Sequence, residues 1–179
     1  MVKAKAPRNK TLELSPKEIA LYASKAVKLS QKSNLTDVIN RVIRQDSFKA
    51  LDLLPDGCID LMIVDPPYNL TKNFGKSTFK EMDFDAYKKW LDKWLKKTVR
   101  LLKDNASIYI CADWKTSICI PEAAGKYFIL RNRISWEREK GRGAKDNWKN
   151  CLEDIWFFTK GKDYTFNIDA VKVQSCLLY

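Results

Sequence analysis

The tetrapeptide Asp65–Pro66–Pro67–Tyr68 carries the residue types with the clearest capacity for chemistry in this sequence. The Asp65 carboxylate and the Pro66 carbonyl are two acceptors, which together can hold both N–H groups of an exocyclic amino group. Proline fixes its own φ and lacks an N–H donor, so the direction of the Pro66 carbonyl is restrained. Tyr68 adds a flat aromatic face on which a planar base can stack. The four residues therefore suit chemistry on a weakly nucleophilic amino nitrogen.

The composition removes most other catalytic devices. The chain has no histidine among its 179 residues, so the usual general base, the Ser/His and Cys/His nucleophile pairs and most mixed zinc sites are absent. Its five cysteines form no CxxC pair, which favours reduced structural thiols over a disulfide framework or a four-thiolate zinc site. We expect no metal site, and any chemistry must use carboxylates, backbone groups and aromatic faces.

The charge balance predicts a polyanionic partner. The net charge is +11, and residues 1–35 hold eight basic and two acidic side chains. A lysine-rich start of this kind either contacts nucleic acid or is a solvated end, and the sequence leaves both open. The chain contains no run of 18 apolar residues and no secretory signal, so we expect a cytoplasmic protein that does not associate with a membrane.

A succession of strands and helices positions the tetrapeptide. The apolar run 59–64 predicts a strand buried on both faces and ended by two prolines, and apolar residues recur at helical spacing over 84–101. Further elements are predicted at 107–111 (strand), about 114–127 (helix), 129–136 (strand) and 154–159 (strand). This order predicts an α/β fold with a mostly parallel sheet and an antiparallel edge strand. Asp65 then lies at the carboxyl end of a parallel strand, where open sheets bind ligands, which favours a functional site over a simple strand-ending turn.

The part of the chain before residue 55 is predicted to be mainly helical. Ser15 and Glu18 have the spacing of a capping box with Pro16 in the first turn, and the helix is expected to reach about Ser30. A short strand is predicted at 41–44, and a second helical turn at 48–54.

The tetrapeptide resembles the catalytic motif of the DNA amino-methyltransferases, which methylate adenine N6 or cytosine N4. The segments 45–69 and 136–160 also resemble the family, and the likeness extends over residues 41–172. It implies a Rossmann-like methyltransferase sheet, S-adenosylmethionine as the methyl donor and double-stranded DNA as the partner. An initial Asp is commoner in adenine enzymes and an initial Ser in cytosine-N4 enzymes, so the resemblance favours adenine.

The resemblance also implies roles for individual residues. Asp65, Pro66 and Tyr68 would be catalytic, since they would hold and stack a base swung out of the duplex. Asp65 and Asp46 would bind the cofactor, because Asp46 stands where the family has an acid that reads the adenosine portion. A helix cap before Phe48 explains Asp46 equally well.

The glycine-rich turn that the family uses to hold the methionine part of the cofactor has no counterpart in this sequence. Gly141–Arg142–Gly143 follows the charged run 136–140 and opens no helix, so we expect it to lie in a basic loop. The chain resembles the family ordering in which the catalytic motif precedes the cofactor motif, stopped after the first block. We therefore expect an amino-terminal portion, truncated or split, with an incomplete sheet and without the main S-adenosylmethionine pocket. A complementary methyltransferase fragment is then a candidate partner.

Two basic loops are the predicted DNA contacts. The loop 69–80 holds three lysines and no acidic residue, and the loop 137–150 surrounds Trp148. Both follow predicted strands near the tetrapeptide and can line a DNA cleft, while a solvated surface loop is the alternative for each. The predicted DNA-binding residues are Lys72, Lys76, Lys80, Arg138, Lys140, Arg142, Lys145, Trp148 and Lys149.

These expectations divide the chain into a basic helical extension at 1–35, the catalytic half of a methyltransferase domain at 36–173 and an unmatched tail at 174–179. The leading function is transfer of a methyl group from S-adenosylmethionine to N6 of a flipped adenine in DNA. The alternatives are a non-catalytic remnant with weak DNA binding and a cytosine-N4 DNA methyltransferase. A methyltransferase acting on RNA or a protein amide is a further alternative, for which an initial Asn is more typical.

Overall fold

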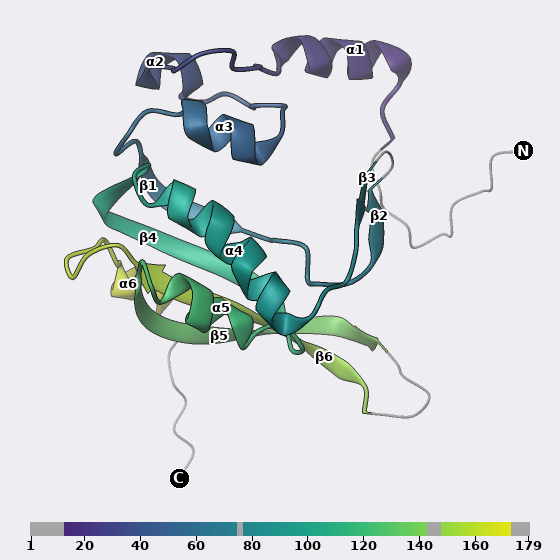
Figure 1. The fold of residues 1–179 in the computed structure, drawn as a ribbon, viewed down its shortest axis with the longest axis vertical. Coiled ribbons are helices and arrows are strands. Elements are labelled where there is room, and N and C mark those ends of the chain that lie inside the picture. Colours follow the sequence, from purple (N-terminus) through teal and green to yellow (C-terminus); the bar gives the residue numbers. More distant parts are fainter. Residues whose placement is uncertain (1–12, 75–76, 143–147, 173–179) are drawn as a thin grey trace, which may run out of the picture. The chain divides into compact units, whose positions relative to one another are not determined.

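The computed structural model of this chain describes residues 13–74, 77–142 and 148–172, which are coloured along the sequence in Figure 1. It separates the chain into two compact units, Met1–Leu54 and Pro55–Tyr179. The three-part division expected from the sequence stays a prediction. Among the described residues, no helix combines the length and the apolar character that a bilayer span requires.

The first unit contains three short helices, α1 (Pro16–Lys25), α2 (Leu35–Val38) and α3 (Ser47–Leu53). The predicted capping box is confirmed, since Ser15 and Glu18 bond to each other's backbone N–H groups at the start of α1. The helix ends at Lys25, earlier than expected, because Ala26 is already extended. The predicted strand at 41–44 is wrong. Only an isolated bridge, Val27 to Ile43, forms there.

The second unit contains a four-stranded sheet with the strand order β1-β4-β6-β5. Its strands are β1 (Ile59–Val64), β4 (Leu102–Asp113), β5 (Ile129–Arg142) and β6 (Asn150–Thr159). β1 runs parallel to β4, whereas β6 is antiparallel to both β4 and β5. The predicted α/β class is confirmed, but the described sheet is mixed where a mostly parallel one was expected, because β6 and β5 return as an antiparallel pair. The parallel pair β1–β4 is the one that carries the tetrapeptide.

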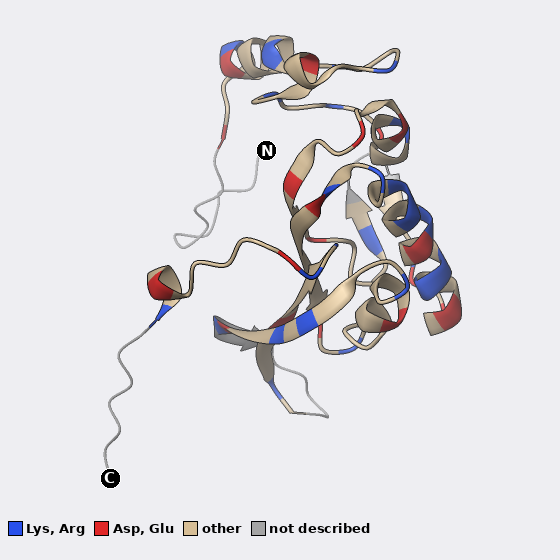
Figure 2. Cartoon of the chain, turned by 90° about the vertical axis from the view of Figure 1, so that its left-hand side faces the viewer, with Lys and Arg blue, Asp and Glu red and all other residues tan. Residues whose placement is uncertain are grey.

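Two helices, α4 (Phe84–Thr98) and α5 (Cys119–Ala124), cover one face of this sheet (Figures 1 and 2). Asp83 caps the start of α4, where its carboxylate accepts from the Ala86 N–H. Apolar side chains of α4 are buried, whereas the lysines at 89, 93 and 96 are exposed. Leu91, Ile108 and Phe158 are fully buried between the two layers. This packing between helices and sheet fixes the position of β1, which ends at the tetrapeptide, and of its neighbour β4.

The expectation that β1 is buried on both faces is wrong. Met62 is buried, whereas Leu61 and Ile63 are 53% and 68% exposed. Alternate residues of a strand point to opposite faces, so only the face that carries Met62 is covered at this strand. A continuous apolar run does not distinguish these two arrangements.

Several polar segments are more regular than expected. The loop predicted at 69–80 contains a hairpin, β2 (Lys72–Phe74) and β3 (Ser77–Phe79). In the loop predicted at 137–150, residues 137–142 continue β5 and Asn150 begins β6. The helix expected over 114–127 is shortened to α5 because a turn led by Asp113 occupies 113–118. A last short helix, α6, covers Ile168–Val171.

Candidate active site

The tetrapeptide leaves the carboxyl end of β1 beside the carboxyl end of β4. Val64 pairs with Ile110, so the parallel strands bring Asp65 and Asp113 to the same edge of the sheet. A wide pocket of about 1210 Å³ opens there. It is lined by the tetrapeptide, by residues 70–72 and 113–115, and by Arg138, 148–150, Leu152 and Glu153 of the β5–β6 strand pair. The tetrapeptide thus lines a pocket of the second unit, at the sheet edge where a ligand site was expected.

A buried tyrosine on α4 anchors the tetrapeptide. The hydroxyl of Tyr87 donates to the carbonyl oxygen of Pro67 over 2.8 Å, and the side chain of Tyr87 is fully buried. Its ring stacks on Trp90 with centroids 5.8 Å apart. Burial above all raises the pKa of Tyr87, so the hydroxyl stays protonated and keeps its donor role. The helix thereby holds the turn through a bond made inside the core.

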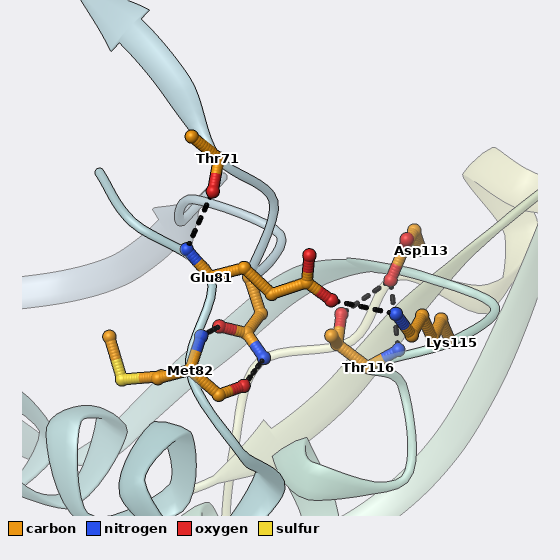
Figure 3. A network of polar contacts seen from close by, with 7 residues as sticks. Thr71, Glu81, Met82, Asp113, Lys115 and Thr116 are labelled. Atoms are coloured by element: carbon orange, nitrogen blue, oxygen red, sulfur yellow. Dashed lines mark hydrogen bonds and ion pairs between the residues drawn. The ribbon is translucent and has the colours of Figure 1, made fainter. Parts of the chain in front are cut away.

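The residue after the tetrapeptide closes the following loop at its base. Asn69 has φ 48°, in the left-handed region that Asn tolerates better than most residues. Its side chain is buried, donates to the Met82 carbonyl over 2.7 Å and accepts from the Met82 N–H over 3.0 Å. Glu81 N–H donates to the Thr71 hydroxyl over 3.1 Å. These contacts join the two ends of the β2–β3 loop. Figure 3 shows the one between Thr71 and Glu81.

An ion pair connects that loop to the turn after β4. Lys115 lies 2.8 Å from the carboxylate of Glu81. The turn itself is ordered by Asp113, which accepts from the backbone N–H of Thr116 over 2.9 Å and also from its hydroxyl. Figure 3 shows the carboxylate of Glu81 reaching Lys115, next to the bonds from Thr116 to Asp113. Two sides of the pocket rim are therefore tied together.

Tyr68 is half-buried and lines the pocket close to two carboxylates. Its hydroxyl donates to Glu153 over 3.5 Å. The pKa of Tyr68 is raised far above its usual value, chiefly by burial. The neighbouring Asp65, as an acceptor and a negative charge, and then the charge of Glu153 raise this pKa further. The phenol is therefore a neutral donor throughout the physiological pH range. Glu153 is paired with Arg138 over 2.7 Å.

Known proteins are similar to this chain in sequence and in fold. Residues 59–176 match the model of the N6/N4 methyltransferase family, described as DNA methylase. The chain belongs to this DNA methylase family. It is 36% identical over 138 residues to the type II methyltransferase M.HpaI of Haemophilus parainfluenzae, a match covering 74% of this chain and 43% of that protein. It is 33% identical over 138 residues to the DNA adenine methyltransferase YhdJ of Escherichia coli strain K12, covering 75% and 46%.

Solved structures give the same fold. The cytosine-N4-specific PvuII DNA methyltransferase matches with a TM-score of 0.59 at 18% identity, covering 82% of this chain and 56% of that one. A DNA modification methylase of Thermus thermophilus, complexed with S-adenosyl-L-methionine, matches with a TM-score of 0.52 at 20% identity, covering 68% and 54%. The expected Rossmann-like methyltransferase fold is confirmed. The chain spans about half the length of the curated relatives it matches, or less.

The pocket of this DNA methylase chain brings together most of the described residues that the sequence singled out. Asp65, Pro66 and Tyr68 line it, and so do four of the predicted DNA contacts, namely Lys72, Arg138, Trp148 and Lys149. Trp148 is 95% exposed at its edge. Lys80 is exposed and does not line the pocket. Lys76 and Lys145, and the side chains of Lys140 and Arg142, lie outside the described residues.

Asp46 lies in the first unit and caps α3. Its carboxylate accepts from the backbone N–H of Lys49 over 3.0 Å, as expected for an N-cap residue. The capping interpretation of Asp46 is therefore confirmed. Its predicted contact with the cofactor stays a prediction.

Sequence reasoning missed Glu153 and Asn69, and it gave Arg138 a different partner. Glu153 precedes Asp154 in a strand whose acidic residues look like ordinary surface positions. Asn69 adjoins the tetrapeptide and forms a clamp, the pair of hydrogen bonds between its side chain and the Met82 backbone. The only local signal of this clamp in the sequence is an amide side chain before a basic loop. Arg138 was predicted as a DNA contact, and in the structure it is engaged by Glu153 with 27% of its side chain exposed.

Proposed function

We propose that the complete gene product transfers a methyl group from S-adenosylmethionine to an exocyclic amino nitrogen of a base in DNA, and that this chain holds the amino group. The observation that carries the proposal is the tetrapeptide at the carboxyl end of β1, lining an open pocket beside exposed aromatic and basic side chains. Membership of the DNA methylase family supports it.

The residues of the tetrapeptide would divide the work on the amino group. Asp65 and the Pro66 carbonyl accept its two N–H groups and orient its lone pair away from them. Tyr68 presents its ring to the base, and Tyr87 keeps the turn in place through Pro67. As the nitrogen becomes tetrahedral its protons become more acidic, so the hydrogen bond to Asp65 strengthens in the transition state. The carboxylate is also placed to take up the proton that the nitrogen loses.

The donor set of the pocket fits a cationic cofactor at its reactive end. S-adenosylmethionine, when bound, supplies an electrophilic methyl group on a positively charged sulfur. Asp65 offers a carboxylate and Tyr68 an aromatic face, and both groups attract a cation. Asp65 and Tyr68 would bind and orient this reactive end. Asp46, in the first unit, stays a candidate for the adenosine portion on the resemblance alone.

The rim of the pocket supports double-stranded DNA as the substrate. Lys72 and Lys149 line the pocket and are exposed, so they can neutralise phosphates. Trp148, almost fully exposed at the same rim, can stack on a base that has left the duplex. We propose adenine N6 as the target atom. Asp65 at the first motif position and the 33% identity to an adenine methyltransferase support this choice.

The decisive experiment incubates the complete gene product with DNA and methyl-labelled cofactor and then digests the DNA to nucleosides. We expect label in N6-methyldeoxyadenosine, identified by mass spectrometry. Label in N4-methyldeoxycytidine would keep the reaction class and change the base. No label in either nucleoside would contradict the proposal.

Asp65→Ala tests the role of the carboxylate. We expect methyl transfer to fall by about 10²–10³-fold, the usual effect of losing a preorganised partner for transition-state charge. Because Asp65 is exposed, its removal should leave the thermal unfolding temperature nearly unchanged. Asp60→Ala is the matched control, since it removes an exposed carboxylate of β1, the strand that Asp65 follows, and this carboxylate pairs with Lys103. Near-normal turnover of Asp65→Ala would remove Asp65 from the mechanism.

A further inference from the structure

The hydroxyl of Tyr68 lies near two carboxylates that can accept its hydrogen bond. It donates to Oε2 of Glu153 over 3.5 Å, while Asp65 lines the same pocket and, as an acceptor and a negative charge, raises the pKa of the hydroxyl. A phenol has one proton to donate, so it cannot serve both carboxylates at once. The carboxylate that receives this proton becomes a weaker acceptor for any other group. The choice therefore decides how strongly Asp65 can bind a target amino group.

Glu153 is fixed by an arginine on the neighbouring strand. Nη1 of Arg138 is 2.7 Å from Oε1 of Glu153, and their side chains are 27% and 15% exposed. The register pairs Trp136 of β5 with Glu153, which places Arg138 on the same sheet face. The ion pair uses Oε1 and leaves Oε2 towards Tyr68. Breaking a partly buried pair of this kind is costly, so the Glu153 carboxylate is held in one place.

We propose that Glu153 is a positioning residue: it accepts the hydrogen bond from the Tyr68 hydroxyl and so leaves the Asp65 carboxylate free to accept from the target amino group. The inference rests on the proposed function, since a free Asp65 is useful only if an amino group binds there. Arg138 acts through Glu153 as its anchor. The bond from Tyr68 is long at 3.5 Å, and such bonds commonly tighten when substrate binds.

The charge of Glu153 is the property that matters in this arrangement. A hydrogen bond to a charged acceptor is about twice as strong as one to a neutral acceptor. If Glu153 becomes a neutral amide, Asp65 is the stronger of the two acceptors and the Tyr68 hydroxyl turns to it. Asp65 then reaches the transition state with one oxygen already engaged.

The test is a double-mutant cycle in the complete gene product. Glu153→Gln should lower kcat about tenfold with little change in the KM for DNA, because the loss falls on the transition state. In a Tyr68→Phe background the same substitution should have no further effect, because no hydroxyl proton remains to be redirected. Glu137→Gln is the matched control. It removes the same charge from the residue next to Arg138, on the exposed side of β5.

Two kinetic results would overturn the inference. An equal loss in both backgrounds would make Glu153 a structural residue, and no loss in the presence of Tyr68 would remove its role altogether. A second measurement does not depend on activity. With ¹³Cζ-labelled tyrosine, the Tyr68 resonance, assigned by its absence in Tyr68→Phe, should shift in Glu153→Gln. An unmoved resonance would also overturn the inference.

The two proposals fail in different ways. If the complete gene product transfers no methyl group to DNA, the proposed function fails, while a shifted Tyr68 resonance still supports the contact with Glu153. If methyl transfer occurs and needs Asp65 but is insensitive to Glu153, only the present inference fails.

Discussion

The side-chain amide of Asn69 pairs with both backbone polar groups of Met82, as one strand residue pairs with another. Its Nδ2 donates to the carbonyl over 2.7 Å, and its Oδ1 accepts from the N–H over 3.0 Å. Asn69 is only 2% exposed, so neither Met82 group has easy access to a replacement from water. This side chain, which adjoins the tetrapeptide, thus closes the base of the β2–β3 loop together with the bond from Glu81 to Thr71.

We expect Asn69→Ala to destabilise the second unit by about 2–4 kcal/mol. The change leaves two polar groups unpaired in a buried place and puts a Cβ-bearing residue without a polar side chain at positive φ. Urea unfolding would measure the loss, and faster hydrogen exchange of the Met82 N–H would localise it. Thr78→Ala is the control, since it removes an exposed hydrogen bond to Asn73 within the same loop. Equal stability of the Asn69 variant and wild type would contradict the clamp.

Tyr87→Phe isolates the anchor of the tetrapeptide. The ring and its packing on Trp90 remain, whereas the 2.8 Å bond to the Pro67 carbonyl is lost. We expect a loss of about 1–2 kcal/mol in unfolding free energy and a reduced kcat for methyl transfer, because the turn is held less firmly. Tyr22→Phe, at an exposed position of α1, should change neither quantity. A stable variant with normal kcat would show that the hydroxyl does not restrain the turn.

Lys72 and Lys149 should contribute to DNA affinity through phosphates. Each replaced by Ala should make the slope of log K against log salt less steep by about 0.9, the value for one phosphate contact on duplex DNA. Fluorescence anisotropy of a labelled duplex at several salt concentrations measures the slope. Lys126→Ala is the control, because that lysine pairs with Asp92 away from the pocket. Unchanged slopes for both variants would remove these lysines from the interface.

Trp148 should stabilise the extruded base. We expect Trp148→Ala to weaken the complex with a duplex carrying 2-aminopurine at the target position by about 1–3 kcal/mol, the usual value of one aromatic stack. The fluorescence increase on binding should fall in parallel. Trp148→Phe should retain most of both signals. Trp136→Ala, which removes an exposed tryptophan that does not line the pocket, is the control. If its effect equals that of Trp148→Ala, stacking at Trp148 is not the cause.

The elements with strong hydrophobic patterns were predictable from the sequence. β1 was placed at its observed bounds because its apolar run stands between a glycine turn and two prolines. α4 was predicted because Tyr87, Leu91 and Leu95 recur at helical spacing. In the structure all three are fully buried or nearly so. The tetrapeptide was found because its residue types are unusual after a buried strand. These signals are local, and local signals survive in a single sequence.

The parts that depend on distant partners were not predictable. The polar stretches that form β2, β3 and the far ends of β5 and β6 carry no apolar alternation, and their strand character comes from pairing. Glu153 gains its meaning only when the register places it beside Arg138 and Tyr68. The exposure of Leu61 and Ile63 could not be read from an apolar run that suits one covered face as well as two.

Tyr68 and Glu153 stand 85 residues apart along the chain. Tyr68 follows β1 and Glu153 lies on β6, and these two strands flank β4 from opposite sides. Contacts of such high sequence separation carry a large loop-closure cost and tend to form late in folding. The antiparallel β5–β6 pair can assemble locally, whereas the tyrosine reaches its acceptor only after β1, β4 and β6 have all joined. The pairing of this phenol with its carboxylate is therefore a reporter of the completed sheet, and a partly folded chain would display the tetrapeptide without the polar environment that tunes it.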